Sequence, residues 1–191
     1  MRRTHEDIQD ELLVLQCQEG DGNALRELIT RWQPRLKRLA WRLTGRREAA
    51  ADVTQEAWMA IVRGLKSLDN PARFRIWAYR IVRNKCADWI SRRAVRRKAV
   101  NDLQESAGSN SAGVVTSGEV NAAESADELA QLRRAISALP DEQRAVLALY
   151  YLDEMGVTDI ATVLSIAPGT VKSRLHQARA RLRHALERMK T

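Results

Sequence analysis

The stretch VTDIATVLSIAPGTVKSRLHQARARLRHAL, residues 157–186, decides the fold of the last part of the chain. A first helical pattern ends near Leu164, and Thr158 is placed to cap its start. Ser165-Ile166-Ala167 then predicts a tight turn, and Pro168 suits the first position of a second helix. The stretch therefore predicts two short helices joined by a three-residue turn.

The second of these helices has one apolar face and one polar face. Val171, Leu175, Ala178 and Leu182 follow spacings of four, three and four, which predicts a buried stripe. The side chains that point outward are Thr170, Lys172, Ser173, Arg174, His176, Gln177 and Arg179. This pattern is typical of a helix-turn-helix whose second helix enters the major groove of DNA. Two amphipathic helices of a small bundle are the alternative.

Charge divides the chain of 191 residues into three parts. Residues 1–100 carry 22 basic and 12 acidic side chains, residues 101–129 none and 6, and residues 130–191 10 and 6. The middle part lacks aromatic residues and is rich in Ser, Gly, Asn and Ala, a composition that cannot bury a core. We therefore expect a helical domain at 1–100, a flexible acidic linker at 101–128 and a helix-turn-helix domain at 129–191.

Composition excludes several classes of protein. With 45% hydrophobic residues the chain folds, and its four Pro and nine Gly favour an all-α fold. No apolar run is long enough for a membrane span and no secretory leader is evident, so we expect a cytoplasmic protein. The two cysteines and three histidines lack metal-ligand spacing, and no metal or cofactor is expected. The net charge of +8 favours nucleic acid as partner over a membrane surface, with a merely basic protein as the alternative.

A helix predicted from about Glu48 to Leu65 carries an unusual polar patch. Val53, Ala57, Ile61 and Leu65 form its apolar stripe at spacings of four. Off that stripe lies an acidic, amide-bearing patch with a thioether, formed by Asp52, Gln55, Glu56 and Met59. An ordinary solvated helix face is the other interpretation.

The next helix, predicted to open near Ala72 after a turn at residues 68–71, combines arginines with aromatic rings. Ala78, Ile81, Val82, Cys86 and Trp89 pack inward on its pattern, whereas Arg73, Arg80, Asn84 and Ser91 lie on the opposite face. A basic face bordered by Phe74, Trp77, Tyr79 and Trp89 suits unpaired DNA, because cations follow phosphates and rings stack on bases. A helix whose rings are all core residues fits the pattern equally well.

Three blocks of the chain together resemble the extracytoplasmic-function sigma factors, the smallest group of sigma-70-like initiation subunits. They are DVTQEAWMAIVRGL (52–65), FRIWAYRIVRNKCADWISRR (74–93) and LPDEQRAVLALYYLDEMGVTDIATVLSIAPGTVKSRLHQARARLR (139–183). The resemblance implies a protein that binds core RNA polymerase and directs initiation at specific promoters, without being an enzyme. An anti-sigma protein is a further partner common in this family.

The resemblance also implies roles for the residues singled out above. Asp52, Gln55, Glu56 and Met59 would dock on the largest polymerase subunit. The minus-10 element would be opened and held by Asp69, Asn70, Arg73, Phe74, Trp77, Arg80 and Asn84, with Asp69 and Asn70 capturing a flipped base. The minus-35 element would be read by the outward residues of the second helix, Lys172 and Arg179 on phosphate and Ser173, His176 and Gln177 nearer base edges.

The sequence departs from the family at a few positions, and two other functions remain open. Thr158-Asp159-Ile160 stands where the family usually has an aromatic residue followed by two acids or by Glu-Ile. Ala167 occupies a position that is often a capping Ser or a similar small residue, and Gln177 stands where many members carry Arg. A conventional helix-turn-helix regulator would need a ligand or phosphoacceptor domain, and a recombinase or nuclease would need a nucleophile or metal site. Residues 1–100 show none of these patterns. We further expect the free chain to bind promoter DNA weakly, because only polymerase would stretch the linker across two DNA turns.

Overall fold

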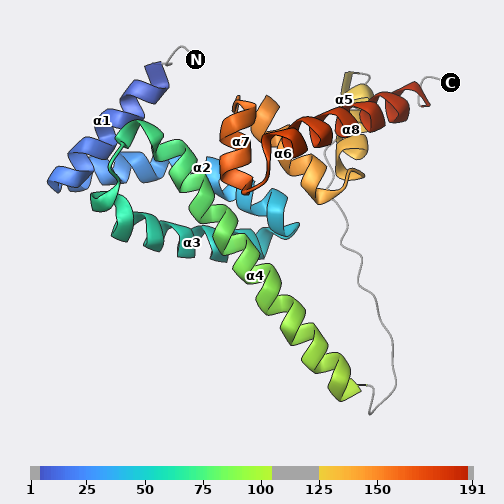
Figure 1. Ribbon diagram of the computed structural model, residues 1–191, viewed down its shortest axis with the longest axis horizontal. Helices are drawn as coiled ribbons and strands as arrows, with labels where there is room; N and C mark the ends of the chain where they lie inside the picture. The colour runs from blue at the N-terminus through green and yellow to red at the C-terminus, as the bar shows by residue number, and fades with distance from the viewer. Residues whose placement is uncertain (1–4, 105–124, 189–191) are drawn as a thin grey trace.

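The computed structural model describes residues 5–104 and 125–188, with side chains described for 5–96 and 130–188. All regular structure in these ranges is helical, as the all-α prediction requires. The helices are α1 (His5–Glu19), α2 (Gly22–Thr44), α3 (Arg47–Gly64), α4 (Phe74–Gln104), α5 (Ser125–Ser137), α6 (Asp141–Tyr151), α7 (Val157–Leu164) and α8 (Pro168–Glu187), with short 3₁₀ turns at Leu65–Ser67 and Pro71–Arg73. Figure 1 shows α4 as a long rod, and α1, α2, α3 and α7 pack against it.

Helices α1 to α4 form the first region around one apolar core. The side chain of Trp32 lies at its centre, fully buried, with the rings of Phe74 and Tyr79 edge-on at 5.3 and 5.7 Å. The predicted stripe of α3, from Val53 to Leu65, is buried. Burial of one Leu or Ile side chain contributes about 2 kcal/mol to the free energy of unfolding. The α3 stripe and the residues around Trp32 therefore supply much of the stability of this region.

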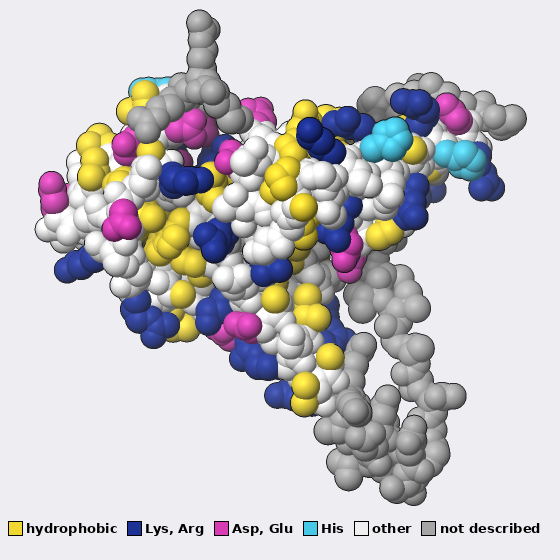
Figure 2. Space-filling model, in the orientation of Figure 1, with side chains coloured by type: hydrophobic (Ala, Val, Ile, Leu, Met, Phe, Trp, Pro, Cys, Tyr) yellow, Lys and Arg dark blue, Asp and Glu magenta, His cyan; other side chains and the backbone are white. Residues whose placement is uncertain are grey.

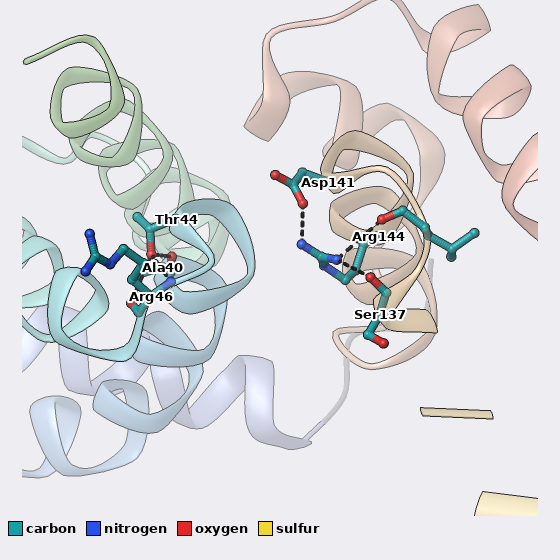
Figure 3. A network of polar contacts seen from close by, with 7 residues as sticks. Ala40, Thr44, Arg46, Ser137, Asp141 and Arg144 are labelled. Carbon is teal, nitrogen blue, oxygen red and sulfur yellow. Dashed lines mark hydrogen bonds and ion pairs between the residues drawn. The ribbon is translucent and has the colours of Figure 1, made fainter. Parts of the chain in front are cut away.

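The ends of α2 are set by local chemistry. Asp21 caps its start by accepting hydrogen bonds from the backbone N–H groups of Asn23 and Ala24. Gly45 ends it in the left-handed conformation, with φ 68°. Figure 3 shows the Thr44 hydroxyl close to the backbone carbonyls of Ala40 and Arg46, to which it donates hydrogen bonds. These contacts fix the turn into α3.

The second region contains the predicted helix-turn-helix as α7 and α8. Ser165, in the left-handed conformation with φ 55°, ends α7, and Pro168 opens α8. The predicted cap at Thr158 is wrong: the N-cap is Gly156, and Thr158 lies inside the first turn of α7 with its carbonyl accepting from Thr162. Val171, Leu175 and Ala178 are buried as predicted.

An arginine braces the junction between α5 and α6. The Arg144 guanidinium donates to the carbonyls of Ser137 and Leu139 at 3.1 and 3.4 Å and pairs with Asp141, as Figure 3 shows. Asp141 lies in the first turn of α6, where a carboxylate is favoured by the helix dipole. The contact fixes the direction in which α6 leaves the turn.

The two regions are packed together along a seam, which sequence analysis did not predict. Helix α7 lies against α4 and α6 against α2 (Figure 1). Asp153, in the connection between α6 and α7, is buried and accepts a hydrogen bond from the Tyr79 hydroxyl at 2.8 Å. The other carboxylate oxygen of Asp153 lies 3.5 Å from Arg42. The arrangement is therefore one packed body over the described residues.

Two helices extend into the segment predicted as a linker. Helix α4 continues to Gln104 and α5 begins at Ser125, both inside the predicted linker of 101–128, and the rest of that linker lies outside the described residues.

Cys17 and Cys86 are free and buried. Burial raises the pKa of the Cys86 thiol to about 12, which makes it a poor nucleophile at neutral pH.

Candidate nucleic-acid interface

The polar patch of α3 is exposed, but one of its members is already paired. Asp52 and Gln55 lie at the surface, and Met59 is 51% exposed. Glu56 is half-buried, with its carboxylate 3.8 Å from Lys85 and 3.5 Å from Arg92 of α4. Glu56 thus joins α3 to α4 at the edge of the patch.

Sequence analysis missed one apolar residue on this surface. Val62 is 42% exposed and follows Met59 by three residues, so it continues the same face of α3. The spacing of three residues from Met59 was the available signal. Met59 and Val62 give the acidic patch an apolar end on which a partner can pack.

The turn before α4 presents its short polar side chains to solvent. Asp69, Asn70 and Arg73 are all exposed. The Gln18 amide of α1 donates to the carbonyls of Leu65 and Leu68 at 2.9 Å each. Sequence analysis did not single out Gln18, because nothing local links a residue of the first helix to a turn so far along the chain.

The aromatic residues of α4 divide into a core pair and a partly exposed pair. Phe74 and Tyr79 are each only 1% exposed, whereas Trp77 and Trp89 are partly buried. The ring of Phe74 is covered by Trp32, so it does not face solvent as a stacking surface. Trp77 lies 6.1 Å from Phe74, which supports it from behind.

A glycine makes room for Trp77. A side-chain carbon at Gly64, the last residue of α3, would lie 2.9 Å from the Trp77 ring. Such a contact is too short for two carbon atoms, so a side chain at position 64 would push the indole away from the end of α3. The accessible ring of this surface is therefore held between α3 and Phe74.

The polar face of α4 runs away from this ring. Arg80 and Asn84 are exposed, as is Ser91, in agreement with the predicted face. The Asn84 carbonyl accepts from Arg83 at 3.2 Å. The face presents guanidinium groups to solvent along one side of α4.

The candidate reading residues of α8 lie on its outer face. Lys172, Ser173 and His176 are exposed, and Thr170 is half-buried. Figure 2 shows Lys, Arg and His side chains gathered over α8 and further Lys and Arg side chains along α4, while acidic side chains collect near α1. The two candidate DNA-binding helices thus carry most of the positive charge of this face.

Three of the outer residues of α8 are held by side chains of α6. Arg174 pairs with Glu142 at 2.5 Å, and the Gln143 amide donates to the Gln177 carbonyl at 3.1 Å. Tyr151, at the end of α6, is the third of these partners, and it accepts a hydrogen bond from Arg179 at 2.9 Å.

The guanidinium of Arg179 also stacks on two rings. It lies 5.4 Å from the centroid of Tyr150 and 5.5 Å from that of Tyr151, within cation–π range. Sequence analysis did not identify any of these partners on α6.

Among the described residues, no helix is long and apolar enough to cross a bilayer. The same part of the chain contains no cluster of three or more His, Cys, Asp or Glu residues placed to hold a metal ion.

Family models match both regions of the chain. Residues 28–96 match sigma-70 region 2, and residues 129–182 match sigma-70 region 4. The first match contains the α3 patch and the polar face of α4, and the second contains the helix-turn-helix.

Curated relatives extend the match to nearly the whole chain. The ECF RNA polymerase sigma factor SigM of Mycobacterium tuberculosis is 35% identical over 188 residues, covering 98% of this chain and 89% of its own. The ECF sigma-E factor of Escherichia coli is 31% identical over 180 residues, covering 91% and 92%. SigW of Bacillus subtilis is 28% identical over 181 residues, covering 91% and 94%.

A solved structure has a similar fold. CnrH, solved in complex with the cytosolic domain of CnrY, matches with a TM-score of 0.62 and 26% identity, covering 94% of this chain and 97% of its own. Two family models in the order region 2 then region 4, and relatives of similar length throughout, lead to one conclusion. The chain belongs to the extracytoplasmic-function group of the sigma-70 family and is an alternative RNA polymerase sigma factor.

Proposed function

We propose that residues 1–100 bind core RNA polymerase and open the minus-10 element, and that residues 129–191 read the minus-35 element. Residues 101–128 would connect the two. Since a sigma factor acts by binding and positioning, the protein would catalyse no reaction of its own and would act in the cytoplasm beside polymerase. The observation that carries the proposal is the acidic patch of α3, exposed on a region of net positive charge.

The patch would be the polymerase-docking surface. Asp52 and Gln55 supply hydrogen-bonding groups for a basic or polar partner, and Met59 supplies a soft apolar contact. Glu56, already paired with Lys85 and Arg92 of α4, would hold α3 in position relative to α4. An exposed patch that contributes nothing to the apolar core fits binding better than stability.

The turn before α4 and the polar face of that helix would hold the minus-10 strand. Asp69 and Asn70 would capture an unpaired base and Trp77 would stack on one, with Phe74 as the buried support behind it. The side chains that would follow the strand backbone and neighbouring bases are Arg73, Arg80 and Asn84. Opening the duplex then needs no enzyme activity, because captured bases shift the equilibrium toward the unpaired state.

Helix α8 would enter the major groove of the minus-35 element. Lys172 and Arg179 would contact phosphates, and Ser173, His176 and Gln177 would face base edges. Thr170 and Arg174 would lie at the margin of this surface, since both are half-buried.

A regulatory protein is also a proposed partner. CnrH was solved with the cytosolic domain of CnrY bound to it, and the family resemblance implies an anti-sigma protein for this chain. Such a partner would compete with polymerase for the free sigma factor.

The test of the proposed function is reconstituted transcription with core RNA polymerase and the promoter upstream of the protein's own coding sequence. We expect specific transcripts with the wild type. The variant Asp52→Ala/Gln55→Ala should bind core polymerase about tenfold more weakly, because two hydrogen-bonding side chains that each contribute about 0.7 kcal/mol are lost from the interface. Its melting temperature should stay within about 3 °C of the wild type, since both residues lie at the surface.

Glu27→Ala/Gln33→Ala is the matched control. It likewise removes one acidic and one amide side chain, from exposed positions of α2, and polymerase binding should not change. Loss of helicity in the α3 variant, or equal weakening by the control, would show that the patch is structural. Absence of any promoter-specific transcript with wild-type protein would reject the proposed function as a whole.

A further inference from the structure

Asp153 has its polar contacts in the other region of the molecule. It lies between α6 and α7 and is 8% exposed. One carboxylate oxygen accepts from the hydroxyl of Tyr79 in α4 at 2.8 Å, and the other lies 3.5 Å from the guanidinium of Arg42 in α2. Tyr79 is 1% exposed and the Arg42 side chain 13%, so all three groups have left water.

The region that contains Asp153 gives its carboxylate no partner among the described residues. Both of its recorded contacts cross the seam. A buried carboxylate without a donor is strongly destabilising, whereas one with a hydroxyl and a guanidinium is tolerated. The position of Asp153 is therefore matched to the packed arrangement and would be solvated if the regions separated.

The Tyr79 phenol is well suited to its place in this contact. Burial, with the nearby Asp153 carboxylate, raises the pKa of Tyr79 well above its ordinary value, so the hydroxyl keeps its proton and donates. Burial lowers the pKa of Arg42 while Asp153 opposes that shift, and the guanidinium remains charged at neutral pH. The Asp153 carboxylate therefore faces two hydrogen-bond donors, the neutral hydroxyl of Tyr79 and the charged guanidinium of Arg42.

The packed arrangement brings the two candidate DNA-binding surfaces too close together. Helix α7 packs on α4, and α8 packs on α7. Packed helices lie about 8–10 Å apart, so the axis of α8 is only roughly 20 Å from that of α4. Promoter elements two DNA turns apart are separated by about 70 Å.

When the two regions separate, the chain between α4 and α5 has to bridge the distance between them. It contains the 20 residues between Gln104 and Ser125. Fully extended, such a segment spans about 70 Å. Separation of the regions is therefore possible without unfolding either of them.

We propose that the contact of Asp153 with Tyr79 and Arg42 is an autoinhibitory latch that holds the free chain closed, and that the latch opens when the chain engages polymerase and promoter. The proposal rests on the proposed function for the need to open. Polymerase then binds only the open fraction, so its apparent affinity is lowered by that fraction. Weakening the latch must raise the affinity.

Charge reversal at the latch is the first test. Asp153→Lys places an ammonium against Arg42, and we expect the radius of gyration of the free chain, measured by small-angle X-ray scattering, to rise by roughly 5 Å. Glu154→Lys is the matched control: it makes the same change of charge one residue away at an exposed position and should leave the radius unchanged. No expansion with Asp153→Lys, or equal expansion with the control, overturns the latch.

Tyr79→Phe tests the latch from the other side of the seam. The ring that packs edge-on against Trp32 is kept and the hydroxyl is lost, so the first region should fold normally. Circular dichroism checks the helicity of every variant. Because this substitution lies outside the region of Asp153, a shared effect of both variants cannot arise from local misfolding around residue 153.

Titration of core RNA polymerase is the decisive measurement. We expect Tyr79→Phe and Asp153→Lys to bind about tenfold more tightly than the wild type, and the Glu154→Lys control to bind as the wild type does. Expansion without tighter binding would show that the closed state does not restrain the protein, and would overturn the proposal. Failure of the wild type to bind polymerase would instead reject the proposed function, while scattering still reports whether Asp153 closes the seam.

Discussion

The polar faces of α4 and α8 differ in how their side chains are held. On α8, Arg174, Gln177 and Arg179 each contact a residue of α6. Arg73, in the turn before α4, and Arg80, on α4, are exposed, and in the described part of the chain neither side chain has a hydrogen-bond or ion-pair partner. Three side chains of the α8 face are therefore held before any ligand arrives, whereas Arg73 and Arg80 are free to adjust.

The difference matches the two forms of DNA that the proposed function assigns to these helices. Base edges in a duplex lie at fixed positions, so side chains already held in place lose less entropy on binding. An unpaired strand is flexible and its phosphates have no fixed spacing, so guanidinium groups that are not held in place can adapt to it. The comparison therefore predicts that α4 supplies affinity and α8 supplies discrimination.

Removing Arg73 and Arg80, the free arginines at and near the start of α4, should have the largest effect. Arg73→Ala/Arg80→Ala is expected to reduce open-complex formation more than tenfold, because two charged contacts to the separated strand are lost, each contributing about 1 kcal/mol or more. Permanganate reactivity of unpaired thymines in the minus-10 element measures this directly. Recognition of duplex minus-35 DNA should be unchanged.

Lys37→Ala/Arg38→Ala is the control for that experiment. It removes two exposed cations from α2 and tests whether net charge alone is responsible. If the control reduces promoter opening as strongly, the face of α4 has no special role and the comparison between the two helices fails.

Loosening a held residue of α8 should have a smaller effect that depends on sequence. Gln143→Met removes the donor that orients the Gln177 amide and fills a similar volume. We expect discrimination at one base pair of the minus-35 element to fall roughly fivefold, with little loss of overall affinity. Binding to a set of single-base variants of the element measures it.

A double variant sharpens that prediction. If Gln143 acts through Gln177, the profile of Gln143→Met should resemble that of Gln177→Ala, and combining the two should add little. Full additivity would mean that Gln143 contributes only to packing. The fold should tolerate the substitution, because Gln143 already carries a buried carbonyl oxygen without a partner among the described residues.

The residues that sequence reasoning placed correctly and those it missed differ in the range of their interactions. The stripe from Val53 to Leu65 and the turn at Ser165 follow from helical periodicity and local backbone preference, so the sequence is sufficient to predict them. Phe74 is covered by Trp32, and Glu56 is paired from α4, both through contacts between separate helices. No local pattern encodes such contacts.

The seam is the clearest case of that limit. Asp153 follows a predicted helix in a stretch where an acidic side chain is ordinary, and Tyr79 lies in another family block far along the chain. Only the packing of α7 on α4 brings them within 2.8 Å. Sequence analysis therefore predicted two reading modules but not the contact that holds them together.

The smallest expected effect comes from releasing Arg174. Its partner Glu142 is a negative charge close to the proposed DNA surface, and Glu142→Gln both frees the guanidinium and removes that charge. We expect affinity for duplex DNA to rise about two- to threefold for any sequence, with the salt dependence steeper by about one phosphate contact. Asp141→Asn is the matched control, because it removes a carboxylate from the same first turn but one that pairs with Arg144 of its own helix. A gain confined to one minus-35 sequence would mean that Arg174 contacts bases. Arg174 would then belong to the residues of α8 that discriminate between sequences.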